Sequence, residues 1–191
     1  MHRRPVKIAM FILETERLNL RHLSPETDAE FILRLLNEPS FLQYVGDKGA
    51  RTLDDARAYI RNGPMKSYEE NGFGLYRVGL KESDQAIGIC GLIKRDTLTD
   101  PDIGFALLPG YWNQGYAYES AAAVIRQARE VLGLRRILAI TTPDNEPSGK
   151  LLGKIGLRFE RLIRLSDDAH EVKLFATDDE TKPHERVADR L

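Results

Sequence analysis

The sequence predicts a mixed α/β domain, and three observations support this fold class. The chain has 191 residues, of which 42% are hydrophobic and 30% charged, which is typical of one soluble globular domain. Its apolar patterns give the order strand, two helices, three strands, helix, strand, helix and two strands. The early strands follow one another closely, whereas the second half contains a strand–helix–strand crossover. We therefore expect a hairpin-built sheet with flanking helices.

The N-terminal third predicts one strand followed by two helices. Residues 13–23 alternate leucines with polar residues, which indicates a strand. Ser24 followed by Pro25 has the pattern of a helix N-cap and a first helical residue. Thr52 and Asp55 have the spacing of a capping box, which predicts the start of the second helix.

The middle of the chain predicts three strands in succession. Pro64 interrupts the second helix, so either a break or a second short helix up to about Asn71 is expected. Strands are then expected at 72–80 and 86–95, joined by a polar turn, and at 102–109.

The last third predicts the crossover and a closing hairpin. A long helix at 115–132 leads to a buried strand at 135–142 and a short helix at 145–156. Two strands at 157–165 and 171–177 close the chain. Steps of three and four residues predict the buried face of the long helix: Ala117, Ala121, Val124, Ala128 and Val131.

Composition excludes several classes of function. The net charge of −1 provides no large field for nucleic acid or an anionic membrane, and no apolar run approaches the length of a membrane span. The single cysteine, Cys90, fits a reducing cytoplasm and is interpreted as a core strand residue rather than a nucleophile. Four scattered histidines give no metal-ligand spacing, so no metal is expected.

The segment Gly110–Ser120, GYWNQGYAYES, predicts a tight turn from a strand into the long helix. The first amide hydrogens of that helix have no partners within it, and the helix dipole adds partial positive charge, so the turn suits a phosphate group. Gly115 would let the backbone approach an oxygen closely, and Asn113 and Gln114 carry side-chain donors. Taken alone, an ordinary packed turn explains the same residues.

The segment 141–160, TTPDNEPSGKLLGKIGLRFE, also follows a strand and enters a helix. Asn145 is either a ligand for amide groups lying beside the sheet or a helix N-cap. Ser148 is either a plain first-turn residue or a hydroxyl that faces the same cleft. The stretch 149–155 only approximates a phosphate-binding P-loop, since its spacing is one residue short and Ile155 replaces the hydroxyl residue.

Together these two segments, 102–128 and 141–160, resemble the acyl-CoA-binding core of the GNAT superfamily of N-acetyltransferases. More narrowly, they resemble the branch that acetylates ribosomal-protein N-termini, of which the opening LETERLNLRHLSPETDAEFI is also typical. The resemblance implies a central, mostly antiparallel sheet with a splayed strand pair and flanking helices. It covers 11–177 as one domain and leaves an N-terminal extension, 1–10, and a charged tail, 178–191.

The resemblance also implies a set of cofactor-binding residues. Asn145 matches the residue that binds the pantetheine arm, and Leu107 lies in the splayed strand whose backbone pairs with that arm. Trp112 stands where many members have Gln or Arg. The cosubstrate implied is acetyl-CoA, bound by Ala106, Leu107, Leu108, Trp112, Asn113, Gln114, Gly115, Tyr116, Ala117, Tyr118 and Asn145.

Catalytic roles follow from the same resemblance. The N–H of Leu107 is the expected oxyanion donor, and Ser148 is the expected proton donor to the leaving thiolate. The position of a tyrosine that serves many other members is Leu152. For the general base, Asp102 is favoured over Glu119, and a water chain to bulk solvent is left open as an alternative. Asp102 also fits a solvated strand-end carboxylate, and Glu119 also fits a partner of the helix dipole.

The predicted function is transfer of an acetyl group from acetyl-CoA to a primary amine by direct attack in a ternary complex. The acceptor is either a ribosomal-protein N-terminus or a small amine, bound by 41–66 and the closing hairpin, with a homodimer left open. Either the acceptor pocket or core packing explains Tyr44, Tyr76 and Tyr111, and His170 is interpreted as a surface residue. The alternative is a non-catalytic CoA-binding sensor or scaffold.

Overall fold

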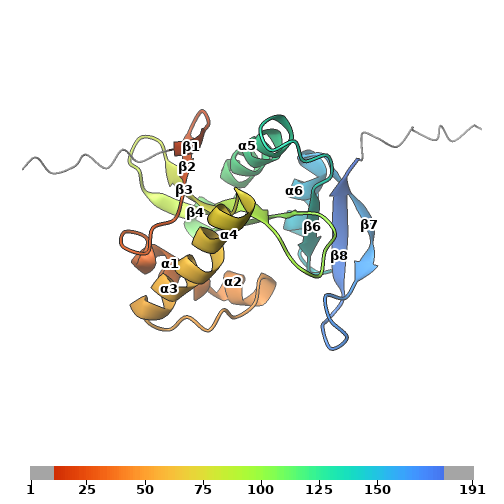
Figure 1. The fold of residues 1–191 in the computed structure, drawn as a ribbon, viewed down its shortest axis with the longest axis horizontal. Coiled ribbons are helices and arrows are strands. Elements are labelled where there is room, and N and C mark those ends of the chain that lie inside the picture. The colour runs from red at the N-terminus through yellow and green to blue at the C-terminus, as the bar shows by residue number, and fades with distance from the viewer. Residues whose placement is uncertain (1–10, 179–191) are drawn as a thin grey trace, which may run out of the picture.

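The computed structural model of the protein describes residues 11–178, which form one mixed sheet with helices on both faces (Figure 1). The predicted α/β class is therefore confirmed. The predicted extension, 1–10, lies outside the described residues, as does the predicted tail apart from Asp178. Of the described helices, none combines the length and apolar character needed to cross a bilayer.

The described strands form an eight-stranded sheet in the order β1-β2-β3-β4-β5-β6-β8-β7. Neighbours are antiparallel except β5 and β6, which run parallel because a helix carries the chain between them. The strands are β1 (Phe11–Glu14), β2 (Leu18–Arg21), β3 (Leu75–Leu80), β4 (Ala86–Ile93), β5 (Asp102–Leu107), β6 (Leu138–Thr141), β7 (Leu157–Ile163) and β8 (Val172–Thr177).

The single strand predicted at 13–23 is wrong, because this stretch is a hairpin of β1 and β2. The turn closes where the Thr15 N–H donates to the Leu18 carbonyl at 2.9 Å and the Thr15 hydroxyl accepts from the Leu18 N–H at 3.0 Å. A threonine hydroxyl thus stabilises a turn in which Gly, Asn or Asp is more usual. The sequence pattern lacked those residues and concealed the reversal.

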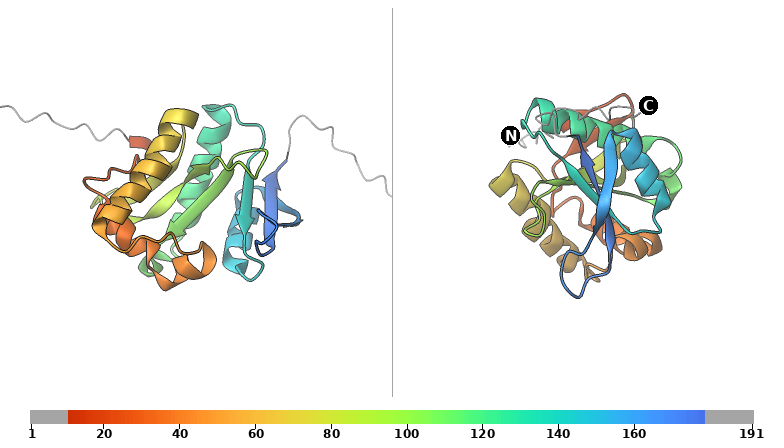
Figure 2. Two further views of the ribbon diagram at one scale, coloured as in Figure 1. Left: turned by 60° about the horizontal axis from the view of Figure 1, so that its bottom comes forward. Right: turned by 90° about the vertical axis from the view of Figure 1, so that its right-hand side faces the viewer.

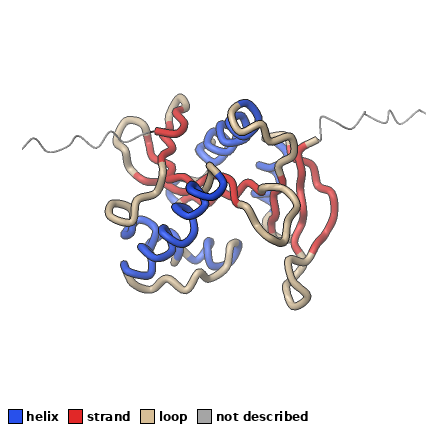
Figure 3. Tube along the Cα trace, in the orientation of Figure 1, coloured by secondary structure: helices blue, strands red, loops and turns tan. Residues whose placement is uncertain are grey.

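One face of the sheet is covered by the helices that precede β3, and the opposite face by the later helices (Figure 3). The Thr52–Asp55 capping box is present, which confirms the predicted helix start. The short helix α2 was not expected from the sequence. The helices are α1 (Ala29–Leu36), α2 (Pro39–Tyr44), α3 (Leu53–Ile60), α4 (Lys66–Asn71), α5 (Tyr116–Glu130) and α6 (Glu146–Lys154).

Of the two alternatives expected at Pro64, the second short helix is confirmed: α4 ends at Asn71, and a π-helical turn, η1 (Arg61–Met65), joins α3 to it. The wider turn accommodates a proline that has no N–H to donate, so the helical path continues. The predicted N-cap at Ser24 is wrong, because α1 begins only at Ala29. Ser24 instead donates its main-chain N–H to the Asp28 carboxylate at 2.8 Å, in the turn before the helix.

The buried face of α5 is largely as predicted. Ala121, Val124 and Ala128 are fully buried in the core, and Ala117 packs at its edge. Val131 is 74% exposed, so its predicted burial is wrong, because the helix ends at Glu130. The core includes the buried thiol of β4, which confirms the structural reading of Cys90, and burial raises the pKa of this thiol to about 12.

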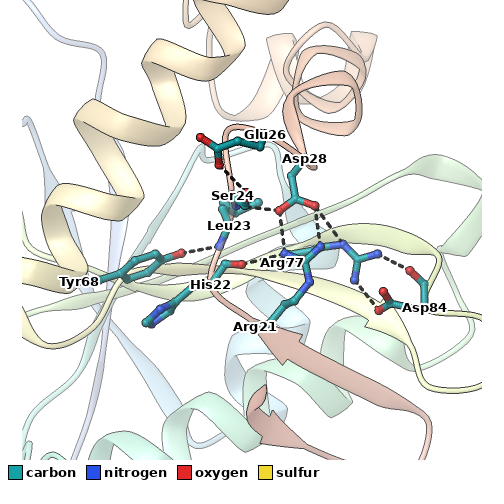
Figure 4. Close-up of polar contacts among 9 residues, drawn as sticks. All are labelled: Arg21, His22, Leu23, Ser24, Glu26, Asp28, Tyr68, Arg77 and Asp84. Carbon is teal, nitrogen blue, oxygen red and sulfur yellow. Dashed lines mark hydrogen bonds and ion pairs between the residues drawn. The ribbon is translucent and has the colours of Figure 1, made fainter. Parts of the chain in front are cut away.

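A polar cluster built around the buried side chains of Asp28 and Arg77 joins β2, α1 and the β3–β4 turn (Figure 4). Asp28 accepts two hydrogen bonds from the Arg21 guanidinium, at 2.7 and 2.8 Å, and lies 3.4 Å from Nε of Arg77. Arg77, which is itself buried, also pairs with Asp84 at 2.9 Å. We call Arg21, Ser24, Asp28, Arg77 and Asp84 the polar cluster. It fixes the first helix against the sheet.

Candidate active site

The parallel strands β5 and β6 separate along their length, as Figure 2 shows. Within the described chain they pair through Asp102 opposite Leu138, where the Leu138 N–H donates to the Pro101 carbonyl at 2.9 Å. Beyond this root the later residues of β5 keep their pairing with β4 alone. The splayed strand pair expected from the sequence is therefore confirmed.

Strand geometry decides which main-chain groups of β5 face the gap. The Leu108 N–H donates to the Ile87 carbonyl of the β4 side at 2.9 Å. Main-chain groups alternate between the two edges of a strand, so those of Ala106 also point to β4 and those of Phe105 and Leu107 point to the gap. Ala106 and Leu108 can then touch a ligand in the gap only through their side chains.

The tryptophan of the loop forms a hydrogen bond to one of these gap-facing main-chain groups. Nε1 of Trp112 donates to the Leu107 carbonyl at 2.8 Å. This bond uses the only polar atom of an indole side chain, so Trp112 holds the loop against the end of β5. The N–H of Leu107 lies on the same edge of the strand as the carbonyl that Trp112 binds.

The turn before α5 has the geometry that its sequence indicates. After a 3-10 turn, η2 (Pro109–Tyr111), Asn113 has φ +59° and Gly115 has φ +83°. Gly115 is the N-cap of α5, and no side chain caps the helix, so its first amide hydrogens have no partner from a capping group. The side-chain amide of Gln114 donates within the loop, to the Gly110 carbonyl at 2.9 Å. The backbone, rather than Gln114, offers the donors here.

The structure adds a residue to this loop that the sequence analysis missed. Arg17, from the β1–β2 turn, donates from Nη1 to the Gln114 carbonyl at 3.0 Å and pairs through Nη2 with Glu119 at 2.7 Å. Its guanidinium also lies 4.5 Å from the centre of the Tyr116 ring. No local signal could have revealed these contacts, because Arg17 and Glu119 are 102 positions apart.

Glu119, one of the candidate bases, is fully engaged. It accepts hydrogen bonds from the Thr15 hydroxyl at 2.6 Å and from the main-chain N–H of Arg17 at 2.8 Å. Burial acts to raise the pKa of Glu119, but these bonds and the Arg17 guanidinium outweigh it and hold the pKa below its ordinary value. A carboxylate with a lowered pKa is a weak proton acceptor, so Glu119 does not suit the role of base.

Asp102 lies at the root of the gap and is 1% exposed, which rules out the solvated strand-end interpretation. Arg95 donates to it from Nε at 2.9 Å. Burial raises the pKa of Asp102, against the opposing effect of Arg95. By alternation along β5, Asp102 shares the sheet face of Ala106, which packs toward α1 and α3.

A shallow hollow of about 400 Å³ lies on the α3 side of the molecule. Tyr59 lies in this hollow. Burial raises the pKa of Tyr59 to about 12, against the opposing effect of the Arg95 charge. Of the tyrosines considered for the acceptor pocket, Tyr76 is buried and stacked on Tyr68, so it belongs to the core. The hollow is lined by Lys48, Gly49, Ala50, Asp55, Ala58, Tyr59, Asn62 and Gly63.

On the other side of the gap, β6 leads into the N-terminus of α6. The Asn145 side chain is the N-cap, and its oxygen accepts from the Ser148 N–H at 3.2 Å. Ser148 is half-buried in the first turn of the helix. The hydroxyl of Thr142, just after β6, is buried and has no hydrogen-bond partner among the described residues. The sequence analysis passed over this threonine.

A family model described as the acetyltransferase (GNAT) domain matches residues 17–158. The chain belongs to the GNAT acetyltransferase family. It is 32% identical over 155 residues to Uncharacterized N-acetyltransferase YoaA of Bacillus subtilis (strain 168), a match that covers 80% of this chain and 86% of YoaA. The protein is an acyltransferase, because the GNAT domain matches and the relative is named as an N-acetyltransferase.

Solved GNAT structures share the fold. A GNAT-family acetyltransferase from Bacillus anthracis is 26% identical with a TM-score of 0.72, covering 90% of this chain and 99% of that one. RimL, a ribosomal L7/L12 alpha-N-protein acetyltransferase solved in complex with coenzyme A, has a TM-score of 0.75 at 16% identity, covering 87% and 96%. The likeness to RimL is one of fold.

Proposed function

We propose that this GNAT enzyme transfers an acetyl group from acetyl-CoA to a primary amine by direct attack within a ternary complex. The observation that carries the proposal is the position of the uncapped start of α5 beside the open edge of β5. The helix start offers an anion site, and the neighbouring edge of β5 offers main-chain N–H groups. This pair of features matches a ligand with a diphosphate at one end and amides along its arm.

The diphosphate is proposed to lie against the main-chain N–H groups at the start of α5, those of Gly115, Tyr116, Ala117 and Tyr118. The positive φ of Gly115 is available to glycine at little cost, whereas other residues are strained there. The loop itself, 109–115, contains no Lys or Arg, so main-chain N–H groups provide most of the attraction.

The pantetheine arm is proposed to enter the gap between β5 and β6. The arm would lie along the gap-facing edge of β5 and bring the thioester to the N–H of Leu107, the oxyanion donor expected from the sequence. Across the gap, Asn145 and the unpartnered hydroxyl of Thr142 offer side-chain donors to the arm.

The chemistry needs few further groups. The amine nitrogen attacks the thioester carbon and gives up a proton, and the carbon–sulfur bond breaks while the thiolate takes a proton. Asp102 is proposed to accept the first proton, directly or through water, since its raised pKa brings it toward the useful range for a base. The Ser148 hydroxyl is proposed to supply the second, because Leu152, the alternative position, is a buried hydrocarbon.

An acceptor panel tests the function. Calorimetric titration with coenzyme A should show binding, and thiol release from acetyl-CoA should depend on an added amine. The panel should contain N-terminal peptides of ribosomal proteins, polyamines, aminoglycosides and amino acids. Coenzyme A binding without thiol release for any amine would instead support the CoA-binding sensor, and absence of coenzyme A binding would contradict both readings.

Ser148→Ala tests the proton donor. Turnover should fall about tenfold or more, with acetyl-CoA affinity little changed, because a hydroxyl that acts on the leaving group matters chiefly in the transition state. Lys150→Ala is the matched control, since Lys150 lies on the same helix and is exposed. An unchanged rate for Ser148→Ala would remove this serine from the mechanism.

A further inference from the structure

The β1–β2 turn is tied to the start of α5 by four residues, which we call the hairpin link: Thr15, Arg17, Gln114 and Glu119. Arg17 bonds the Gln114 carbonyl through Nη1 and Glu119 through Nε and Nη2. A Cβ at Gly115 would lie 3.1 Å from Nη2 of Arg17, so the guanidinium lies directly against the glycine. Arg17 is 44% exposed and Glu119 16% exposed.

The bond to Gln114 fixes the orientation of one peptide plane. The carbonyl of Gln114 and the N–H of Gly115 belong to the same planar peptide, so they point in opposite directions. While Arg17 holds the carbonyl on its own side, the Gly115 N–H is directed away from Arg17. Glycine permits a wide range of backbone angles, so without this bond the plane would be free to turn.

The bond to Glu119 settles the charge next to the proposed diphosphate site. Glu119 lies in the first turn of α5, where an unpaired carboxylate would repel a bound anion. Arg17 cancels this charge at 2.7 Å, and Thr15 and the main-chain N–H of Arg17 hold the carboxylate in place. The helix start then attracts an anion with the field of its own amides.

We propose that Arg17 is a positioning residue for the donor substrate, because it orients the 114–115 peptide and neutralises Glu119 so that the diphosphate of acetyl-CoA can bind at the start of α5. This inference rests on the proposed function. It assigns Arg17 an effect on the diphosphate end of the donor and none on the thioester end.

Two acetyl donors separate this role from a merely structural one. Acetyl-CoA carries the diphosphate, and S-acetylpantetheine carries the same thioester and arm without it. For Arg17→Gln we expect the KM for acetyl-CoA to rise about tenfold or more with kcat within about twofold. The kcat/KM for S-acetylpantetheine should equal that of the wild type.

Partner substitutions sharpen the test. Arg17→Gln combined with Glu119→Gln should recover part of the lost acetyl-CoA affinity, because the unpaired carboxylate is gone. Arg17→Lys should be intermediate, since an ammonium restores the charge but cannot bond Gln114 and Glu119 in the same fork. Lys81→Gln is the matched control, because it removes a cation of the β3–β4 turn that pairs with Glu14 at 3.1 Å and donates to the Thr15 carbonyl at 3.3 Å, without touching Gln114 or Glu119.

The outcomes are distinct. An equal loss for both donors would show that Arg17 only supports the structure, and an unchanged KM for acetyl-CoA would show that it has no role; either result overturns the inference. A wild-type protein that binds no coenzyme A by calorimetry would overturn the proposed function itself. Thermal midpoints of all variants establish that each is folded at the assay temperature.

Discussion

Two arginine–carboxylate groups fix the β1–β2 hairpin to the rest of the molecule, and they differ in burial. In the polar cluster, the Asp28 side chain is 3% exposed and its hydrogen bonds go to Arg21 and Ser24. In the hairpin link, Arg17 is nearly half exposed and sits beside helix amides that have no capping partner. The difference in burial assigns the first group to the stability of the fold, and our inference assigns the second to ligand binding.

Electrostatics gives this division its scale. Removing one partner of a buried ion pair costs about 3–5 kcal/mol, because the other charge is left without water or a counter-charge. An exposed pair is worth about 0–1 kcal/mol, since water screens it and the side chains lose freedom to form it. Substitutions in the two regions should therefore separate stability from affinity.

The largest effect on stability is expected for Asp28→Asn. The change keeps the shape of the side chain but leaves Arg21 and the buried Arg77 without its charge. We expect a loss of about 3–5 kcal/mol in the free energy of unfolding, measured with urea at neutral pH. Coenzyme A affinity of the folded protein should stay within about twofold of the wild type.

Asp84→Asn is the control for that measurement. Asp84 also pairs with Arg77, at 2.9 Å, but its side chain is mostly exposed, so the expected loss is about 1 kcal/mol. If both variants lost the same small amount, or if Asp28→Asn lost coenzyme A affinity while fully folded, the polar cluster would not be the purely structural group described here.

Gly115→Val should have the opposite effect, a large loss of coenzyme A affinity and a small loss of stability. A β-branched residue at φ +83° is strained, and its Cβ would meet the Arg17 guanidinium at 3.1 Å. We expect coenzyme A affinity to fall about tenfold or more, measured by calorimetry, with a loss of about 1–2 kcal/mol in stability. Normal coenzyme A affinity in the folded variant would contradict the diphosphate cradle.

Gly133→Val provides a matched comparison, because Gly133 also has a positive φ, +65°, but lies just beyond the far end of α5. It should cost similar stability through the same backbone strain and leave coenzyme A affinity unchanged.

The geometry of the candidate site was largely predictable from the sequence, because its parts are local. The strand, the glycine turn and the helix that follow one another at 102–130 fix the position of Gly115 relative to β5. Asn145 and Ser148 are likewise neighbours on one short helix, where the capping alternative for Asn145 is confirmed. Periodicity and capping chemistry act over a few residues, so one sequence is enough to recognise them.

The contacts that the sequence missed are nonlocal or depend on an uncommon local geometry. Arg17 meets Gln114 only because the sheet order places β2 near α5, which no pattern within 13–23 indicates. Pro64 continues the helical path only because a π-helical turn forms there. Burial of Asp102 is also a tertiary effect, since a carboxylate at a strand end has no sequence mark of being covered.

The pH dependence of stability should report the hairpin link. Because the folded state lowers the pKa of Glu119, the stability that Glu119 contributes is fully present above its ordinary value of 4.5 and is lost as the pH falls through the lower folded value. The difference in urea midpoint between wild type and Glu119→Gln should thus be constant from neutral pH down to about 5 and shrink below 4.5. A difference that stayed undiminished as the pH fell well below 4.5 would mean that Glu119 stabilises the protein by means other than its charge.

The smallest effect is expected for Asp54→Asn, at the exposed limit of the comparison. Asp54 pairs with Arg57 at 2.7 Å on α3 and its side chain is 89% exposed. It also lies in the first turn of that helix, where a negative charge interacts with the dipole. We expect a loss of about 0.5 kcal/mol or less in urea unfolding at low ionic strength, and less still in about 0.5 M salt, because added salt screens both contributions.

Arg57→Gln separates the two contributions of Asp54, because it removes the ion pair and keeps the carboxylate at the helix start. A loss for Arg57→Gln close to zero would assign the effect of Asp54→Asn to the dipole. A loss for Asp54→Asn as large as that for Asp28→Asn would be the more serious result, since it would show that burial does not set the energetic scale on which the polar cluster and the hairpin link are distinguished.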